Sequence, residues 1–268
     1  CALANVERGK LRSFNTPFVD ESQDPSGSIQ ADPTAEHEVR GQLASIACSV
    51  IMTLMFCCRL ARYDILRGAA NLATFLHRWT ANTDKKLNRL MGYINCHLSD
   101  MAIGFVGDGL DDLWLALFAD ADFAGDKLGS KSTGGAFLVL MGPHTFFPLA
   151  AHSKKQGSTA NSSTEAEIVS LAIALRHIGI PALDLWEELL GRKVKLVVYE
   201  DNQATATIVK TGQFEKSMGH VKRCHGVQLQ TLTERLRDGT FVLEDCHTEC
   251  MAADIFTKHF SEVQKWQH

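Results

Sequence analysis

Acidic residues follow apolar segments of this sequence at places where they could bind a divalent metal ion. Asp120 comes directly after the run LWLALFA, and Asp201 comes after KLVVY and one glutamate. Both runs predict strands, so the two carboxylates could project from neighbouring strand ends toward one point. Carboxylate oxygens are ligands that hard cations such as Mg²⁺ prefer, and rigid strand ends can hold them together despite their repulsion. Taken alone, each aspartate is more often a turn residue or a helix cap.

Two further acidic residues lie in segments that are expected to be helical. Glu167 belongs to the run SSTEAE, where Thr164 with Glu167 and Ser162 with Glu165 both have the spacing of a capping box. Glu165 and Glu167 point in nearly opposite directions on a helix, so only one of them can face a shared site. Asp254 lies in the short amphipathic segment MAADIFTK and is by itself a solvated helix residue. A functional role is favoured because these residues fall on separate elements that can converge.

The elements that must position these side chains alternate from Leu113 onward. The short apolar runs WLALFAD, GAFLVLM and HTFFPLA are separated by glycine- and serine-bearing turns, which predicts three strands joined by hairpins. The segments that follow are a helix from Ser163, a helix over 181–190, a strand before Asp201, a helix over 203–210, a basic helix, the strand TFVLED and a helix from Met251. This order predicts an α/β fold, a mixed sheet flanked by helices.

The first part of the chain predicts a different organisation. Residues 1–35 contain the run SQDPSGSIQADPT without apolar periodicity, so we expect a disordered tail. Residues 36–105 contain three apolar stretches with helical periodicity, which predict a small helical segment. The uncharged run from Gly41 to Cys58 reaches the lower length limit of a membrane span. Small and hydroxylated residues dilute it, so a buried helix is favoured and no membrane partner is expected.

The composition is that of an ordinary soluble globular protein, with 45% hydrophobic and 22% charged residues. A net charge of −4 gives no global attraction to nucleic acid, so such a partner must be bound by a local basic patch. The eight cysteines lack the regular spacing of a secreted disulfide scaffold. Zinc could be bound by Cys224, Cys246, Cys250 and adjacent histidines, but the tight C-x-x-C pairs of structural zinc modules are missing.

The first residue is Cys1, and no basic region leads into an apolar core as in a signal peptide. We therefore expect a fragment of a longer protein that is cytoplasmic or nuclear and is not secreted.

Four motifs occur in an order that is typical of one known family. They are ADADFAGDKLGSKSTGG, HSKKQGSTANSSTEAEIVSL, YEDNQATATI and MAADIFTKHF. Their succession resembles the ribonuclease H domain of copia-type (Pseudoviridae) retrotransposon Pol polyproteins, over about residues 113–260. The resemblance implies a ribonuclease H-like mixed five-stranded sheet flanked by helices and preceded by a small helical segment. It also implies a metal-dependent endonuclease, a hydrolase that cleaves the RNA strand of an RNA–DNA hybrid.

The family's metal site can be carried over to this sequence motif by motif. Its ligands are the acidic residue after the first strand, the second Glu of TEAE, the Asp of DNQ and the Asp of ADI-x-TK. These correspond to Asp120, Glu167, Asp201 and Asp254, which would hold two Mg²⁺ or Mn²⁺ ions as the catalytic metals. Asp122 lies on the same side of an extended strand as Asp120 and is an alternative first ligand. Asp120 is preferred because it follows the apolar strand directly.

The resemblance further implies contacts to an RNA–DNA hybrid, the expected partner. Polar groups beside the metals are needed to recognise the 2′-hydroxyl of RNA, and basic residues are needed for the phosphates. Basic residues outnumber acidic ones over 205–238, although a solvated helix face explains each lysine there equally well. The candidate nucleic-acid contacts are Lys154, Lys155, Asn202, Gln203, Lys222 and Arg223.

The segment before Leu113 resembles the end of the reverse transcriptase in the same polyproteins. Its clearest match is the run RYDI at 62–65, where the family usually has R-P-D-I. The polymerase motif Tyr-x-Asp-Asp is missing, so no polymerase activity is assigned, and the rest of a reverse transcriptase is an expected partner. The alternative is a catalytically inactive retroelement remnant that serves as a nucleic-acid-binding or structural module. His247 lies near the position of a mobile histidine in cellular ribonucleases H, but a surface-loop histidine is the simpler interpretation.

Overall fold

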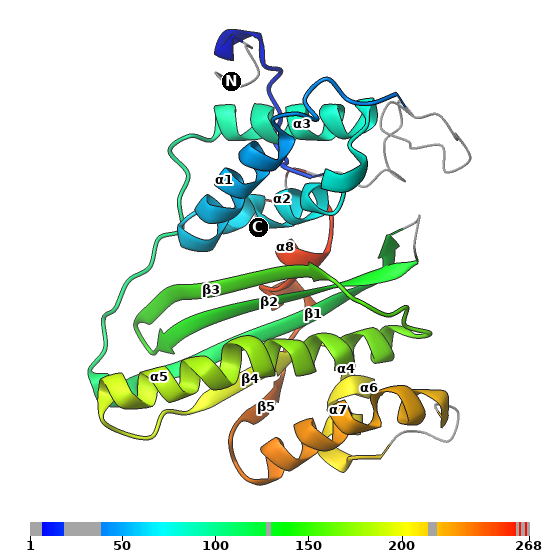
Figure 1. Cartoon of the computed structure of the whole chain (residues 1–268). Coiled ribbons are helices and arrows are strands. Elements are labelled where there is room, and N and C mark those ends of the chain that lie inside the picture. The colour runs from blue at the N-terminus through cyan, green and yellow to red at the C-terminus, as the bar shows by residue number, and fades with distance from the viewer. Residues whose placement is uncertain are drawn as a thin grey trace. The chain divides into compact units, whose positions relative to one another are not determined.

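The computed structural model describes residues 7–18, 39–126, 130–213 and 219–260, together with Val263 and Trp266. These residues fall into two compact units. The first comprises Cys1–Ala102 and Lys258–His268, and the second comprises Ile103–Thr257. The helices and strands of both units are labelled in Figure 1.

The first unit is helical, as expected for this part of the chain. Its elements are α1 (Ala47–Leu60), α2 (Leu66–Ala73) and α3 (Ala81–Cys96), with 3-10 turns at Arg8–Lys10, Tyr63–Ile65 and Leu76–Arg78. Apolar residues at helical spacing, such as Ile51, Leu54 and Leu90, are buried. Thr80 caps α3 by accepting a hydrogen bond from Thr83 N. The sequence periodicity therefore reflects a small helical core.

Part of the predicted disordered tail is folded onto these helices. The guanidinium of Arg67 lies 4.8 Å from the ring centre of Phe18, and that of Arg89 lies 4.7 Å from the ring centre of Phe14. Thr16 accepts a hydrogen bond from Arg89 and is only 2% exposed. The prediction is thus wrong for residues 7–18, because cation–π contacts produce no periodicity that the sequence could reveal. Residues 1–6 and 19–38 lie outside the described part of the chain.

The RYDI segment has a structural role in the first unit. Arg62 donates two hydrogen bonds to Asp64, at 2.9 and 2.8 Å, and the Tyr93 hydroxyl donates a third to Asp64 at 3.1 Å. Tyr63, which stands where the R-P-D-I motif has proline, is buried. Burial also raises the pKa of Tyr93. The motif therefore links the start of α2 to α3.

The second unit is built on one five-stranded mixed sheet. The strands are β1 (Trp114–Asp126), β2 (Lys131–Gly142), β3 (Thr145–Lys155), β4 (Leu196–Glu200) and β5 (Val242–Asp245), in the spatial order β3-β2-β1-β4-β5. The three long strands form antiparallel pairs, whereas β4 runs parallel to β1 and β5 runs parallel to β4. The predicted fold class, an α/β fold with a five-stranded mixed sheet flanked by helices, is confirmed (Figure 1).

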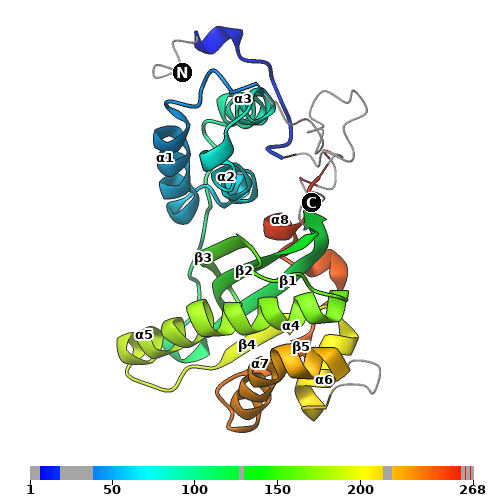
Figure 2. The same cartoon turned by 45° about the vertical axis from the view of Figure 1, so that its right-hand side comes forward.

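Helices lie on both faces of this sheet (Figures 1 and 2). They are α4 (Ser163–Ala174), α5 (Ile180–Leu190), α6 (Gln203–Thr211), α7 (Gly219–Arg237) and α8 (Asp254–Thr257), with 3-10 turns at Leu110–Asp112 and Thr248–Cys250. The main core lies between the sheet and α4, where Leu117, Leu138 and Leu171 are almost fully buried. The short helix α8 lies on the opposite face from α4.

The helix break expected before Pro181 does not occur. A π-helical turn, Leu175–Gly179, joins α4 to α5, and Ile180 N donates to the carbonyl of Leu175. A wider π turn accommodates a proline, which lacks an N–H and crowds the carbonyl four residues earlier.

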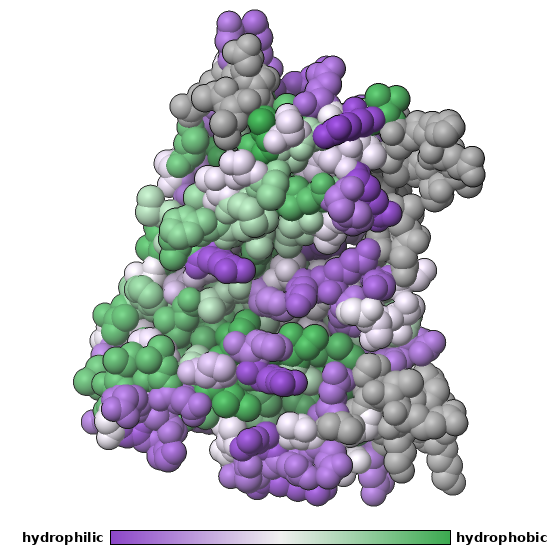
Figure 3. Space-filling model, in the orientation of Figure 1, coloured by the Kyte–Doolittle hydropathy of each residue, from purple (hydrophilic) through white to green (hydrophobic). Residues whose placement is uncertain are grey.

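The resulting stretch Ser163–Leu190 is long and apolar enough to cross a membrane by length and composition alone, a test that core helices of soluble proteins also pass. Figure 3 shows apolar side chains over α5, where Leu185 and Leu189 are exposed.

Candidate metal centre

The register of two parallel strands places Asp120 beside Asp201. Phe118 of β1 pairs with Tyr199 of β4, and the two rings stack with centres 4.8 Å apart. Asp120 and Asp201 each follow two residues later in the sequence. β4 ends at Glu200, whereas β1 continues to Asp126, so Asp120 lies inside a strand and not at its end as the sequence suggested. The site therefore forms where a short strand stops alongside a long one.

Helix α4 brings the third carboxylate to this point. Ser170 donates a 2.7 Å hydrogen bond to the backbone carbonyl of Asp120, which fixes the helix to β1 at that residue. Glu167 stands three positions earlier on α4, so it lies on the same side of the helix as Ser170. A Cβ on Gly134 would lie 2.8 Å from Ser170 Oγ, so this glycine allows the close approach of α4.

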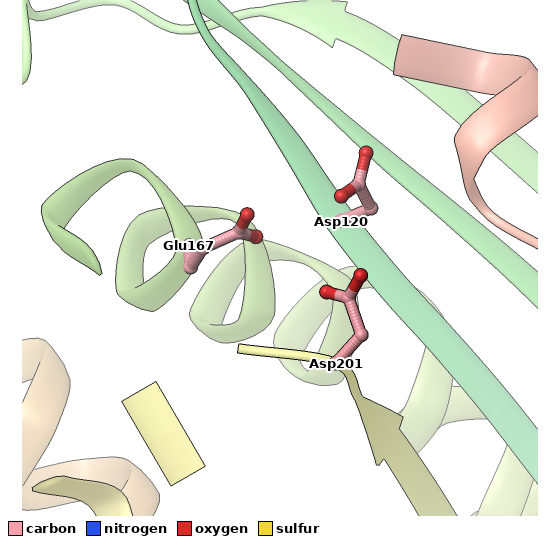
Figure 4. A group of neighbouring side chains, drawn as sticks. All are labelled: Asp120, Glu167 and Asp201. Atoms are coloured by element: carbon pink, nitrogen blue, oxygen red, sulfur yellow. The ribbon is translucent and has the colours of Figure 1, made fainter. Parts of the chain in front are cut away.

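Three carboxylates converge as a result. One oxygen each of Asp120, Glu167 and Asp201 lies within 4.8 Å of the other two, and Figure 4 shows the side chains pointing toward one another from β1, α4 and the end of β4. Asp120 and Glu167 are 2% and 6% exposed, and Asp201 is half-buried. In the parts of the chain that the structure describes, this is the one group of His, Cys, Asp or Glu arranged to hold a metal ion. An all-oxygen donor set fits a hard divalent cation such as Mg²⁺ or Mn²⁺.

The two alternative acidic residues have other surroundings. Glu165 accepts hydrogen bonds from the backbone and side chain of Asn161, at 2.8 and 3.2 Å, while its own N–H donates to the N-cap residue Ser162. It therefore closes the start of α4, as a capping residue does. The carboxylate of Asp122 lies so close to Gly125 that a Cβ there would collide with it. Neither residue belongs to the converging group.

Asp254, the fourth predicted ligand, begins α8 and is not among the three. Burial raises the pKa of the Cys246 thiol most, and smaller increases come from Cys250 and from the charges of Asp201 and Asp254. Asp254 thus lies near the site, while its carboxylate stays outside the 4.8 Å group.

Sequence reasoning missed Glu200, which directly precedes Asp201. Its side chain is 1% exposed, and Oε1 accepts a 3.2 Å hydrogen bond from Asn202 N. Oε2 is buried and accepts no hydrogen bond from any residue that the structure describes. Burial raises the pKa of Glu200 well above its usual value, and the charges of Asp201 and Asp120 raise it further. In the sequence, Glu200 could have been recognised only as a glutamate at the end of an apolar strand.

The candidate nucleic-acid contacts divide into three groups. Lys154 is exposed and Lys155 is half-buried at the end of β3. Asn202 is the N-cap of α6 and accepts a hydrogen bond from Thr205 N, while Gln203 is exposed. Lys222 and Arg223 belong to α7, but their side chains lie outside the described residues.

The proposed zinc ligands do not form a cluster within the described residues. His247 is exposed and its Nδ1 accepts a hydrogen bond from Glu249 N, as expected of a surface-loop histidine. Cys246 and Cys250 are free thiols. Cys224 and His225 have side chains outside the described part of the chain.

Comparison with curated proteins confirms the resemblance to retrotransposon polyproteins. The retrovirus-related Pol polyprotein from transposon RE1 of Arabidopsis thaliana is 28% identical over 238 residues, which is 89% of this chain and 15% of the polyprotein. The one from transposon RE2 of the same plant is 27% identical with the same coverage. This chain therefore spans about 15% of the length of these relatives. No protein-family model matches it.

Solved structures with a similar chain arrangement have low sequence identity. Ribonuclease H1 from Halobacterium salinarum is 15% identical, with a TM-score of 0.38 over 53% of this chain and 93% of that chain. The foamy viral protease-reverse transcriptase in complex with dsDNA is 14% identical, with a TM-score of 0.45 over 81% of this chain and 40% of that chain.

Proposed function

We propose that the chain is a ribonuclease H, a metal-dependent phosphodiester hydrolase that cuts the RNA strand of an RNA–DNA hybrid. The observation that carries this proposal is the convergence of Asp120, Glu167 and Asp201 from three separate elements of the second unit. Metal-assisted hydrolysis needs such a set, because several fixed carboxylates must hold cations against the charge of a phosphodiester. The similarity to two Pol polyproteins supports the assignment.

The residues of this chain supply a preorganised anionic site. Asp120 and Glu167 are buried on a strand and a helix, so their side chains lose little further freedom when a cation binds. Asp201 is the most exposed of the three. When bound, divalent cations can activate a water molecule and stabilise the leaving oxygen. We assign two Mg²⁺ or Mn²⁺ ions to the site, with Asp254 as a fourth ligand at its border.

Substrate and partner assignments follow from the same proposal. Lys154 and Gln203 are exposed and could contact a phosphate or a 2′-hydroxyl of the hybrid. The remaining part of a reverse transcriptase is the proposed protein partner. A cytoplasmic or nuclear location is part of the same proposal, because cysteines stay reduced in those compartments.

The test is cleavage of an end-labelled RNA–DNA hybrid by the purified full chain with Mg²⁺ or Mn²⁺. Asp120→Asn and Asp201→Asn keep the shape of the side chain but remove the charge that binds a hard cation, so both should abolish cleavage while the chain still folds. Asp122→Asn and Glu165→Gln are matched controls, since they remove a neighbouring carboxylate outside the group. Both controls should cut the hybrid, although Glu165→Gln weakens a cap worth about 1 kcal/mol.

Two results would overturn the assignment. Equal cleavage by the unmutated chain and both asparagine variants would exclude this site. A folded, metal-supplied unmutated chain that leaves the hybrid intact would instead support the inactive remnant.

A further inference from the structure

A buried threonine contacts one of the three carboxylates. The Thr257 hydroxyl donates a hydrogen bond to Asp120 Oδ2, and the two residues are 0% and 2% exposed. They are far apart in sequence, and Thr257 is the last residue of α8. In Figure 4 the two oxygens of Asp120 point in different directions, one of them toward Glu167. A hydroxyl donor on one oxygen leaves the other to face the remaining carboxylates.

Helix α8 is too short to hold this position by itself, and the sheet fixes it. The Phe256 ring packs on Phe137 of β2 with centres 5.6 Å apart, and the Phe256 carbonyl accepts a 2.6 Å hydrogen bond from Ser153 of β3. The Thr257 hydroxyl is hydrogen-bonded to Asp120 of β1, so the four residues of α8 contact three adjacent strands. Ser153 is buried, so water competes little for its hydrogen bond.

A glycine opposite Asp120 makes room for the helix. Gly135 is the cross-strand partner of Asp120 in the pairing of β1 with β2. A Cβ at Gly135 would lie 2.6 Å from Thr257 Cγ2, closer than ordinary contacts allow. Its neighbour Gly134 provides the space for Ser170 of α4 on the other face. The Gly134-Gly135 pair therefore lets one helix approach β1 from each side, and each helix donates a hydroxyl to Asp120.

We propose that Thr257 is a positioning residue for the metal centre: its hydroxyl holds the Asp120 carboxylate in the orientation that binds the cation. The proposal rests on the proposed function for its catalytic consequence, but the orientation of Asp120 is a property of this chain alone. Hydrogen bonds to a ligand's second oxygen fix its rotamer, and loss of such a contact typically costs about 10- to 100-fold in metal affinity or activity.

The experiment compares three variants of the full chain. Thr257→Val keeps the size and branching of the side chain and removes the hydroxyl, whereas Thr257→Ser keeps the hydroxyl. Thr233→Val is the control, because Thr233 is also buried and its hydroxyl donates to the Val209 carbonyl away from the site. The readouts are Mn²⁺ affinity by calorimetry, the thermal midpoint without metal, and hybrid cleavage.

Thr257→Val should weaken Mn²⁺ binding by about 10-fold or more and reduce cleavage in proportion. Thr257→Ser should bind Mn²⁺ with the affinity of the unmutated chain. Thr233→Val should lower only the thermal midpoint. Unchanged Mn²⁺ affinity in Thr257→Val, or an equal loss in Thr233→Val, would overturn the proposal, as would absence of Mn²⁺ binding by the unmutated chain. If the unmutated chain binds Mn²⁺ without cutting the hybrid, the proposed function fails, while the affinities still decide the role of Thr257.

Discussion

Gly135→Ala tests how tightly α8 is packed over the metal centre. The new Cβ would lie 2.6 Å from Thr257 Cγ2, 3.0 Å from Phe256 Cβ and 3.1 Å from the carbonyl oxygen of Ala253. Ordinary van der Waals contacts to a Cβ begin at 3.4 Å, so the nearest atom must retreat by nearly 1 Å. Two of the three contacts involve atoms on or next to the backbone, so a change of rotamer cannot relieve them. The whole turn of helix has to move away from β2.

The magnitude follows from these contacts. Overpacking a close-packed site by one methyl group costs about 1–3 kcal/mol. For a unit of this size each kcal/mol lowers the thermal midpoint by about 2–4 °C, so the expected loss is roughly 2–12 °C. A shift of about 1 Å in a group that orients a catalytic residue can cost about 100-fold in rate. Hybrid cleavage should therefore fall more than stability alone predicts.

The assay measures thermal midpoint and cleavage rate for Gly135→Ala, Thr257→Ser and the double variant. Thr257→Ser lacks the Cγ2 methyl group that meets the new Cβ, but it keeps the hydroxyl that bonds Asp120. The double variant should therefore be more stable than the sum of the two single effects predicts, by about 0.5 kcal/mol or more. Strict additivity, or a Gly135→Ala chain with unchanged midpoint and rate, would show that α8 is not held against Gly135.

Two further predictions concern buried ionisable groups. Glu200 keeps its proton in the folded, metal-free chain at pH values where the unfolded chain has lost it, because burial raises its pKa. Stability therefore falls as pH rises above the unfolded pKa of about 4.3, and Glu200→Gln should raise the thermal midpoint near neutral pH but not at pH 4. If Glu200→Gln and the unmutated chain had the same midpoint at neutral pH as well as at pH 4, the prediction would be contradicted. Burial, with smaller contributions from Asp64 and Cys57, raises the pKa of Cys58 to about 12, so about one thiol in 10⁴ is ionised at pH 8. Iodoacetamide should alkylate exposed Cys48 far faster than buried Cys58, and equal rates in peptide mapping would refute it.

Much of the α/β unit could be predicted because local sequence patterns mark its strands and turns. Alternating apolar runs and glycine-bearing turns mark β1, β2 and β3, and the parallel strand β4 is marked by the run KLVVYE. Three of the four predicted ligands converge because each is fixed by the element that carries it. Pro148 in β3 did not disturb the prediction, since an edge strand tolerates a proline.

The errors concern features that depend on packing between elements. Asp120 was placed at a strand end, because the apolar run stops there. The strand continues because residues 120–122 pair with Thr133 and the glycines before Ala136. Pro181 suggested a break, but the π turn before it absorbs the missing N–H. Neither pairing partners nor π turns leave a periodic signal in one sequence.

In the segment MAADIFTK, the sequence and the structure single out different residues. Its sequence draws attention to Asp254, the only acidic residue in it, whereas the structure places the Thr257 hydroxyl on Asp120 and leaves the Asp254 carboxylate outside the group of three. Both residues lie on the same side of one helical turn, since they are three positions apart. Without bound cations a fourth carboxylate is repelled by the other three, while a hydroxyl donor is attracted to them. Under the proposed function, the same turn therefore offers a hydrogen-bond donor to Asp120 and carries, in Asp254, an anion that bound cations would attract.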